Sequence, residues 1–355
     1  MFILLLLLFT PVEAQQGLPF ELGGMQGLLS PGGEWIITPE FISIKPLFED
    51  MAAAKALVTG KSHPILNGEK WGYVGKDGSW IISPQFDQVE NFHQGTARVK
   101  LLKNWGLIGP QGQWLAKAIY EDINAFKEDL ALFYKNGAFG WMNISGQEVI
   151  PARFQGGGSF KNGLAPAKAQ GKWGIIDTQG NFQVPPTFDK LDSFTFTTAP
   201  ARNNGKWGLV NPRGQWIIPP TFEDIKGDSQ NIYRVKSQGK WALCDGMGKL
   251  LTRYDYDEME KSEEGYLRVK KQDLWGFLDV KGTLVAAPAW EKAESFSQGL
   301  ARVRVGKLWG YLDTSFNLAL PAVYEKADDF NGPLARVRIS GSWVPIDHKG
   351  IVQSF

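Results

Sequence analysis

The chain has almost no cysteine, since Cys244 is the only one among its 355 residues. An intramolecular disulfide is therefore impossible, and stability must come from packing. Histidine is nearly as scarce: His63, His93 and His348 are scattered along the sequence. Because Cys and His do not cluster, we expect no zinc-type metal site, and we expect Cys244 to be a buried, inert thiol.

The sequence also lacks an excess of charge of either sign, with 38 Lys and Arg against 37 Asp and Glu. This balance gives no reason to expect a nucleic-acid partner or binding to an anionic membrane surface. Catalytic motifs are missing as well: no Gly-rich phosphate loop, nucleophile elbow or paired catalytic motif stands outside the repeat described below. We therefore predict a protein that is not an enzyme and that holds no cofactor.

Long apolar runs are absent. The run from Phe2 to Phe9 is too short to cross a membrane, and Pro11 and Val12-Glu13-Ala14 follow it. Residues 1–14 therefore resemble a secretory signal peptide cut near Ala14, although no Lys or Arg precedes the run. We expect an exported protein, periplasmic or extracellular, that does not span the membrane.

What the sequence does contain is a repeat. The stretch GKWGIIDTQGNFQVPPTFDK at 171–190 returns as GKWGLVNPRGQWIIPPTFED at 205–224. Steps of 34 residues connect a column that we call the main Trp column: Trp71, Trp105, Phe139, Trp173, Trp207, Trp241, Trp275, Trp309 and Trp343. A period this regular indicates a tandem array, regular over 71–355. Residues 24–41 align with 69–86, so one more unit precedes the regular array. This unit, residues 24–70, has eleven extra residues somewhere in 42–70. We expect it to be a divergent N-terminal capping repeat within the same domain.

The columns beside the Trp predict two strands joined by a turn. A Gly follows the Trp in most units, with Ala242 and Val344 as exceptions, so another backbone or a ring should lie against that position. An Asp or Asn opens the turn and a Gly three residues later closes it, which is typical of a type I turn with a left-handed Gly. Phe316 breaks this Gly column, and Asn317 is expected to take the left-handed position there. Prolines such as Pro186 and Pro220 end the second strand.

A third strand alternates basic and apolar residues, as in Arg98-Val99-Lys100 and Arg268-Val269-Lys270. Alternation marks a half-buried strand, and its place in the unit predicts the outer edge of a three-stranded meander. If these strands align, they form a basic stripe of Arg98, Lys100, Arg234, Lys236, Arg268, Lys270, Arg302, Arg304, Arg336 and Arg338. The stripe is either a solvated edge paired with the acidic residues of the repeat, or a contact surface for an anionic partner.

Taken together, the pattern KWG-x-[IVL]-[DN]-x-x-G, the proline-ended second strand and the R-V-K strand resemble the WG-repeat family of bacterial proteins. The resemblance covers residues 24–355. It implies a β-rich repeat array, often in exported or surface-associated proteins, and it supplies no catalytic residues to map onto this chain.

Two of the three strands are apolar on both faces, so successive units must cover one another. About ten units exceed the four to eight blades of most propellers, which favours an open superhelical stack of three-stranded antiparallel meanders, with a closed β-propeller-like ring as the alternative. The eight tryptophans of the main column (Trp71, Trp105, Trp173, Trp207, Trp241, Trp275, Trp309 and Trp343) are expected to form the repeat core. The acidic columns should stabilise turns or pair with Arg and Lys rather than bind calcium.

Three functions remain open from the sequence. The first is an exported, non-enzymatic repeat scaffold that contacts a protein or another envelope component through an extended surface. The second is a polysaccharide or cell-wall binding module, which requires exposed aromatic residues. The weakest is a hydrolase on a propeller-like fold, which requires acidic or His residues that converge in a pocket.

Overall fold

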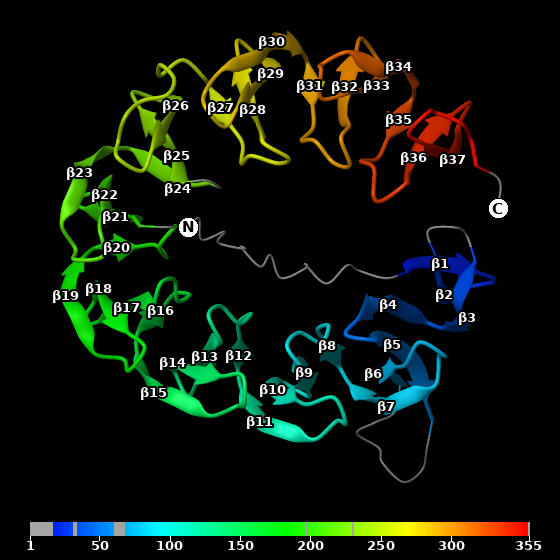
Figure 1. The fold of residues 1–355 in the computed structure, drawn as a ribbon, viewed down its shortest axis with the longest axis horizontal. Helices are drawn as coiled ribbons and strands as arrows, with labels where there is room; N and C mark the ends of the chain where they lie inside the picture. Colours follow the sequence, from blue (N-terminus) through cyan, green and yellow to red (C-terminus); the bar gives the residue numbers. More distant parts are fainter. Residues whose placement is uncertain (1–16, 31–33, 60–67, 196, 229–230, 354–355) are drawn as a thin grey trace, which may run out of the picture. The chain divides into compact units, whose positions relative to one another are not determined.

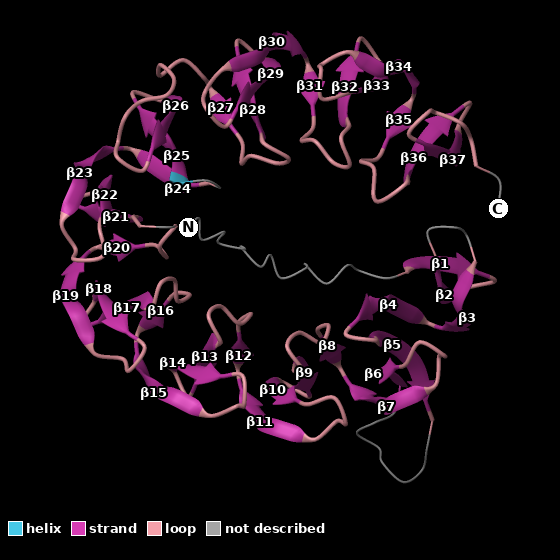
Figure 2. Cartoon of the chain, in the orientation of Figure 1, coloured by secondary structure: helices cyan, strands magenta, loops and turns pink. Residues whose placement is uncertain are grey.

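The computed structural model describes residues 17–30, 34–59, 68–195, 197–228 and 231–353. The predicted signal peptide and His63 lie outside these ranges. The described residues form strands joined by turns and contain no α-helix; the short cyan piece beside β24 in Figure 2 is a 3₁₀ turn at Asn231. Accordingly, no helix in this part of the chain is long and apolar enough to cross a membrane.

The chain divides into two compact units, Met1–Ser159 and Phe160–Phe355. The strands of the N-terminal unit are β1 Leu18–Leu22, β2 Met25–Leu29, β3 Trp35–Phe41, β4 Ser43–Phe48, β5 Met51–Val58, β6 Gly68–Val74, β7 Trp80–Phe86, β8 Gln88–Val89, β9 Ala97–Leu101, β10 Asn104–Ile108, β11 Trp114–Tyr120, β12 Asp122–Ile123, β13 Leu130–Lys135, β14 Ala138–Asn143, β15 Glu148–Phe154 and β16 Gly156–Gly157. Figure 1 labels them along the chain.

The strands of the C-terminal unit are β17 Leu164–Ala169, β18 Lys172–Asp177, β19 Phe182–Phe188, β20 Lys190–Leu191, β21 Ala199–Asn203, β22 Lys206–Val210, β23 Trp216–Phe222, β24 Asp224–Gly227, β25 Ile232–Ser237, β26 Lys240–Asp245, β27 Glu258–Met259, β28 Tyr266–Lys271, β29 Leu274–Asp279, β30 Leu284–Trp290, β31 Lys292–Ala293, β32 Ala301–Val305, β33 Leu308–Leu312, β34 Leu318–Tyr324, β35 Lys326–Ala327, β36 Leu334–Ile339 and β37 Ser342–Asp347.

Consecutive strands pair antiparallel into small sheets, which we call blades. A complete blade has four strands in chain order, as in β8-β9-β10-β11 or β27-β28-β29-β30. In six of the seven four-stranded blades of the described residues the first strand has two residues, whereas β4 has six, and the last strand always has seven. Three blades, β1-β2-β3, β24-β25-β26 and β35-β36-β37, have three strands.

The basic strand is not an outer edge, which corrects the sequence prediction. Arg98-Val99-Lys100 lies in β9, which pairs with β8 on one side and with β10 on the other. Each blade therefore takes its first two strands from one 34-residue repeat and its last two from the next. The edges of a blade are the two-residue strand, which is too short to leave an alternation pattern, and the long strand.

A tight turn before most of the Trp strands explains this arrangement, although residues 59–67 separate β5 from β6. Asn204 and Gly205 have φ of 51° and 79°, and they join β21 to β22. Two successive left-handed residues are typical of a type I′ hairpin turn, for which Asn-Gly is the strongest short sequence signal. Asn136-Gly137 repeats it. The sequence thus carried a hairpin signal at the point where we expected a boundary between units.

Meandering four-stranded sheets are the blades of β-propellers. The all-β repeat fold is therefore confirmed, and the blades match the β-propeller-like alternative. The structure does not support the favoured open superhelical stack of three-stranded meanders. That prediction rested on the number of repeats, and the described part of the chain does form ten sheets, so blade number alone was a poor guide to the type of array.

Each hydrophobic core lies between successive blades of one unit. Leu107 and Tyr120 from the β8–β11 blade pack with Phe133 and Met142 from the β12–β15 blade. The same arrangement recurs in the C-terminal unit, where Phe277 packs with residues of the next blade. Because both faces of a blade are covered in this way, both apolar columns after the Trp are buried, as expected.

The Gly column is required by close backbone contact. A Cβ on Gly208 would lie 2.2 Å from the Ile218 carbonyl oxygen, and one on Gly276 would lie 2.6 Å from that of Ala286. The long strand comes this close because its pairing shifts register at this point. The sequence prediction of a backbone against the Gly is confirmed.

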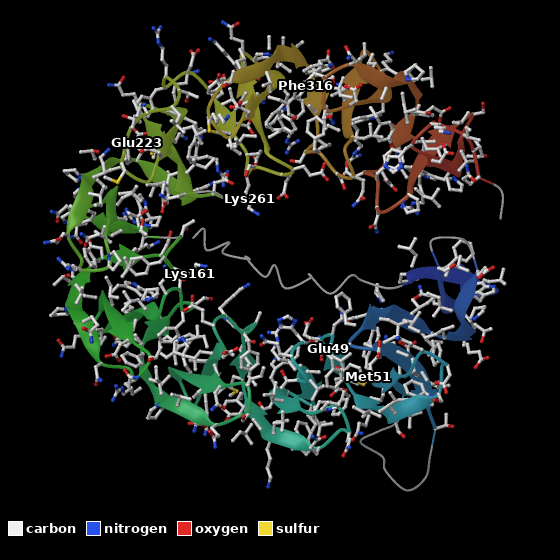
Figure 3. The ribbon with its side chains drawn as sticks, viewed as in Figure 1. Glu49, Met51, Lys161, Glu223, Lys261 and Phe316 are labelled. Atoms are coloured by element: carbon white, nitrogen blue, oxygen red, sulfur yellow. The ribbon has the colours of Figure 1, made fainter. Side chains whose placement is uncertain are left out.

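The turn column differs from the prediction at one residue. Phe316 itself takes the left-handed conformation, with φ of 62°, so the expectation for Asn317 was wrong. The Phe316 ring (labelled in Figure 3) packs against the rings of Tyr266, Phe277 and Phe296. These contacts offset the cost of a left-handed conformation at an aromatic residue.

Candidate interaction surfaces

The main Trp column borders the blade cores without being fully enclosed. Trp241 is 7% exposed, Trp343 is 46% exposed, and the other six rings are half-buried. Cations lie over several of these rings: Arg268 Cζ is 4.7 Å from the centre of the Trp275 ring. The column thus contributes to the core, and a Lys or Arg side chain lies over the rings of Trp71, Trp105, Trp241, Trp275, Trp309 and Trp343.

The stripe arginines connect one blade to the next. Arg98 Nη1 donates to the Ile123 carbonyl oxygen at 2.5 Å, and Arg234 Nη1 donates to that of Met259 at 3.0 Å. Arg268 and Arg302 donate in the same way to Ala293 and Ala327. In every case the acceptor lies on the two-residue strand of the following blade. We call Arg98, Arg234, Arg268 and Arg302 the tether arginines.

Arg336 occupies the same column but makes no such contact. Its side chain is 72% exposed, and Nη2 lies 2.8 Å from Asp328 Oδ2 within its own blade. The other stripe residues contact acidic side chains or a Trp ring. Lys270 pairs with Glu258 at 3.1 Å, Arg304 with Glu291 at 2.6 Å and Arg338 with Glu325 at 3.5 Å. Lys100 lies over the Trp105 ring, and Lys236 lies over the Trp241 ring.

The acidic residues after the aromatic column cap the type I′ turns. Asp189 Oδ2 accepts a hydrogen bond from the Asn204 N–H at 2.9 Å, and its other oxygen pairs with Lys172. These contacts, Lys172 first, hold the pKa of Asp189 below its ordinary value. In the Asp or Asn column that opens the turn after the Trp strand, Asp177 Oδ1 accepts hydrogen bonds from the N–H groups of Gln179 and Asn181. The Asp177 column stabilises turns, as the sequence predicted. The acidic column after the aromatic residue pairs with basic residues of the third strand, as predicted and as seen between Glu291 and Arg304, and it also caps turns, which was not predicted.

Tryptophans at the start of three long strands form a more exposed surface. Trp35, Trp80 and Trp114 begin β3, β7 and β11, and they are 38%, 37% and 39% exposed. We call them the Trp edge. The Trp80 ring covers Gly72, where an added Cβ would meet ring atom Cζ3 at 2.8 Å, and Trp114 covers Gly106 in the same way.

Each of these strands also ends in an aromatic residue that contacts the next blade. The ring centres of Phe41 and Trp80 are 5.5 Å apart at 84°, and those of Phe86 and Trp114 are 6.0 Å apart at 88°. Aromatic side chains therefore follow the long-strand edge of three successive blades. The row stops at Glu148, which takes the Trp position of β15 and accepts a hydrogen bond from the Tyr120 hydroxyl at 2.9 Å.

Cysteine and histidine do not converge on a reactive site. Cys244 is fully buried, and burial raises the pKa of its thiol to about 12, so the thiol stays protonated at neutral pH. His348 stacks on Phe330, with ring centres 4.3 Å apart. Within the described ranges, no three His, Cys, Asp or Glu side chains are grouped so that they could hold a metal ion.

These blades, cores and tethers define a β-propeller-like repeat protein. The family model for the WG containing repeat matches residues 71–104, 105–137, 139–173, 173–207, 207–241, 243–275, 275–309 and 309–343. The chain belongs to the WG-repeat family. No curated protein matches it.

Solved structures resemble the chain in fold only. A structure described as the eukaryotic initiation factor aligns with a TM-score of 0.50 and 10% identity, over 86% of this chain and 96% of that one. Hsv2p of Kluyveromyces lactis aligns with a TM-score of 0.38 and 10% identity, over 64% and 92% of the two chains. BamB from Moraxella catarrhalis aligns with a TM-score of 0.34 and 12% identity, over 76% of this chain and 87% of that one. At these identities nothing about function follows.

Proposed function

We propose that the protein is an exported, non-enzymatic binding array whose N-terminal unit holds a carbohydrate polymer along the Trp edge. The observation that carries this proposal is the half-exposure of Trp35, Trp80 and Trp114 at one position of three successive blades. One face of each of the Trp80 and Trp114 rings is supported by a Gly. The open part of a flat ring is a surface on which the C–H groups of a sugar can stack, because the ring face is electron-rich.

The spacing of the Trp edge favours a polymer over a single sugar. Six residue steps separate Trp80 from Phe86, or about 20 Å at the usual rise of a strand, and the next Trp lies in ring contact with Phe86. One sugar cannot reach two such rings. An extended chain can contact several of them, so that weak contacts add along its length.

The experiment replaces Trp80 and Trp114 with Leu together. Leu284 and Leu318 occupy the same column in the C-terminal unit, so Leu is compatible with the blade. We expect the double variant to keep its melting temperature within a few degrees and to lose retardation in gels that contain envelope polysaccharide. Trp216→Leu, in the other unit, is the matched control and should bind normally. Retardation unchanged in the double variant would reject the proposal.

The C-terminal unit favours a second candidate, a protein contact. Two of its long strands, β30 and β34, expose Leu284 and Leu318 in place of Trp, each 48% exposed, and Val323 further along β34 is 55% exposed. Exposed aliphatic rows of this kind mark protein interfaces. Crosslinking in the native envelope, with Leu284→Asp/Leu318→Asp as the comparison, tests it: loss of a crosslinked partner supports a scaffold role, and an unchanged pattern removes it.

Export is part of the proposal, and residues 1–14 support it by their likeness to a signal peptide. Fractionation of cells that produce the full chain and a variant lacking residues 2–14 tests it. We expect the full chain outside the cytoplasm and the truncated chain inside it. The same location for both chains would contradict export.

A further inference from the structure

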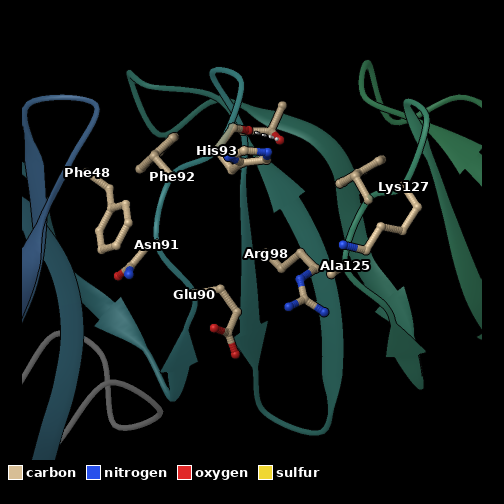
Figure 4. Close-up of a pocket in the computed structure, with 10 residues that line it drawn as sticks. Phe48, Glu90, Asn91, Phe92, His93, Arg98, Ala125 and Lys127 are labelled. Carbon is tan, nitrogen blue, oxygen red and sulfur yellow. Dashed lines mark hydrogen bonds between the residues drawn. The ribbon is translucent and has the colours of Figure 1, made fainter. Parts of the chain in front are cut away.

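A pocket of about 290 Å³ lies among three successive blades of the N-terminal unit. Figure 4 shows its lining. Arg98 and Lys127 supply cationic groups, and Glu90 is the acidic residue beside them; Phe48 and Phe126 contribute apolar surface. At this volume the pocket suits a small molecule rather than a polymer segment.

Arg98 differs from the other tether arginines in what surrounds its guanidinium. Arg302 uses Nη1 for its tether and places Nε at 2.5 Å from Asp329 Oδ1 and Nη2 at 3.4 Å from Oδ2. Arg268 also pairs with a carboxylate, Glu294, but through Nη1, at 2.6 Å. The carboxylate thus comes from the following blade, 26 or 27 residues after the arginine.

At Arg98 these two positions are Asn124 and Ala125. Arg98 makes the same tether, to Ile123, but no carboxylate of the described residues pairs with it. The pocket opens where the missing side chain would lie, since Ala125 is part of its lining. Lys127, also in the lining, adds a second cation without an ion pair of its own in the described structure.

We propose that this pocket binds a small monocarboxylic acid, whose carboxylate takes the place that Asp329 fills at Arg302. The two carboxylate oxygens accept hydrogen bonds from Arg98 Nε and Nη2, the atoms that Arg302 gives to Asp329. The positive charge of Lys127 also attracts the carboxylate of the ligand. The negative charge of Glu90 repels a second anionic group, so we expect a ligand with one negative charge. The Phe48 and Phe126 side chains contact the apolar body of the acid.

Asn91 adds a requirement for a hydrogen-bond donor. Its Oδ1 atom is buried and accepts no hydrogen bond among the described residues, and the side chain belongs to the pocket lining. A buried acceptor without a donor is costly. A ligand that carries a hydroxyl or amine at the end remote from its carboxylate would supply the donor.

Isothermal titration of the full chain with 4-hydroxyphenylacetate tests the proposal, because this probe has a carboxylate, an apolar ring and a donor. We expect saturable binding, and at least about tenfold weaker binding of the uncharged 4-hydroxyphenylacetamide, since hydrogen bonds to charged groups are worth about that factor or more. Inorganic phosphate should not compete. Tighter binding of phosphate than of the acid, or equal binding of acid and amide, would overturn the carboxylate assignment.

The decisive variant is Ala125→Asp, which copies the arrangement at Arg302 and fills the site with the chain's own carboxylate. It keeps Arg98 and its tether, so the fold should be retained, and binding should fall at least about tenfold. Arg302→Gln is the control: it removes an arginine of the same column away from the pocket and should bind within about twofold of the parent. Unchanged binding by Ala125→Asp, or no saturable binding by the parent chain, would reject the site.

Discussion

Two neighbouring blades of the C-terminal unit differ in one strand. The β20–β23 blade has four strands, whereas the β24–β26 blade has three; residues 250–256 make isolated bridges to β26 at Leu250 and Tyr256 and single hydrogen bonds such as Leu251 N–H to the Leu243 carbonyl at 2.8 Å, but form no strand. The complete blade has Gly208 after its Trp and the incomplete one has Ala242. The fourth strand forms beside glycine, because only glycine lets its backbone approach so closely.

Within the incomplete blade, Arg234 and Asp228 form the most buried ion pair among the described residues. Arg234 Nε lies 3.2 Å from Asp228 Oδ2, with side chains 7% and 0% exposed. Asp228 also accepts hydrogen bonds from the N–H and hydroxyl of Ser262 in the following segment. Side-chain contacts between blades thus accompany the missing strand pairing.

Arg234→Leu should give the largest effect. It leaves the Asp228 carboxylate buried without its cation, which costs about 3–5 kcal/mol, while Leu is tolerated in this column at Leu132. We expect the free energy of unfolding, measured in urea, to fall by that amount. Arg268→Leu is the matched change in a complete blade; since Glu294 is 34% exposed, the loss should be about 1–2 kcal/mol. Equal losses would show that the two tethers are equivalent.

Gly276→Ala should disturb a complete blade. The added Cβ would lie 2.6 Å from the Ala286 carbonyl oxygen, so the long strand must shift, at a cost of about 1–3 kcal/mol. Amide exchange should then increase in β30. If exchange and melting temperature stay the same, the glycine does not control the fourth strand.

Ala242→Gly asks whether glycine is sufficient for a fourth strand. We expect a loss of about 0.5–1 kcal/mol, because Gly is less favourable in a strand, and no new protection of residues 250–256 from amide exchange. The Thr252 hydroxyl already accepts the Leu243 N–H, and this contact holds the segment in its own conformation. New protection there would mean that the side chain of Ala242 alone prevents pairing.

Asp189→Asn should have the smallest effect. Lys172 and the Asn204 N–H lower the pKa of Asp189 in the folded protein, so the carboxylate stabilises the fold above its ordinary pKa. This contribution is lost as the pH falls through the lowered pKa. The variant should melt slightly below the parent at pH 7, and the difference should vanish in strong acid. Glu223 caps the corresponding turn of the incomplete blade, so Glu223→Gln should also melt slightly below the parent at pH 7.

The sequence predicted the parts of the fold that depend on local chemistry. The Asp177 turn, the close contact at Gly208 and the burial of Cys244 follow from residue type and spacing. The short first strand of the blade did not, because two residues such as Gln88-Val89 are too few to show an alternation pattern. The blade boundary was also missed, although Asn204-Gly205 marked a hairpin.

The candidate surfaces were less predictable. Alternation shows that Arg98 and Arg302 face the same way, but not that a carbonyl of the following blade accepts their hydrogen bonds. The missing carboxylate at Ala125 becomes visible only after the contact between Arg302 and Asp329 is known. The half-exposure of Trp80 depends on the ring lying over Gly72, a cross-strand contact that the period does not specify.

The offset between repeat and blade also bears on how such a chain can change in length. A blade is assembled from the end of one repeat and the start of the next, so its limits do not coincide with those of the repeated segment. Recombination between copies that adds or removes one period, wherever the crossover falls, inserts or deletes the equivalent of one whole sheet and keeps the order of strands. Array size can therefore vary between generations without a requirement for the breakpoint to match a structural boundary.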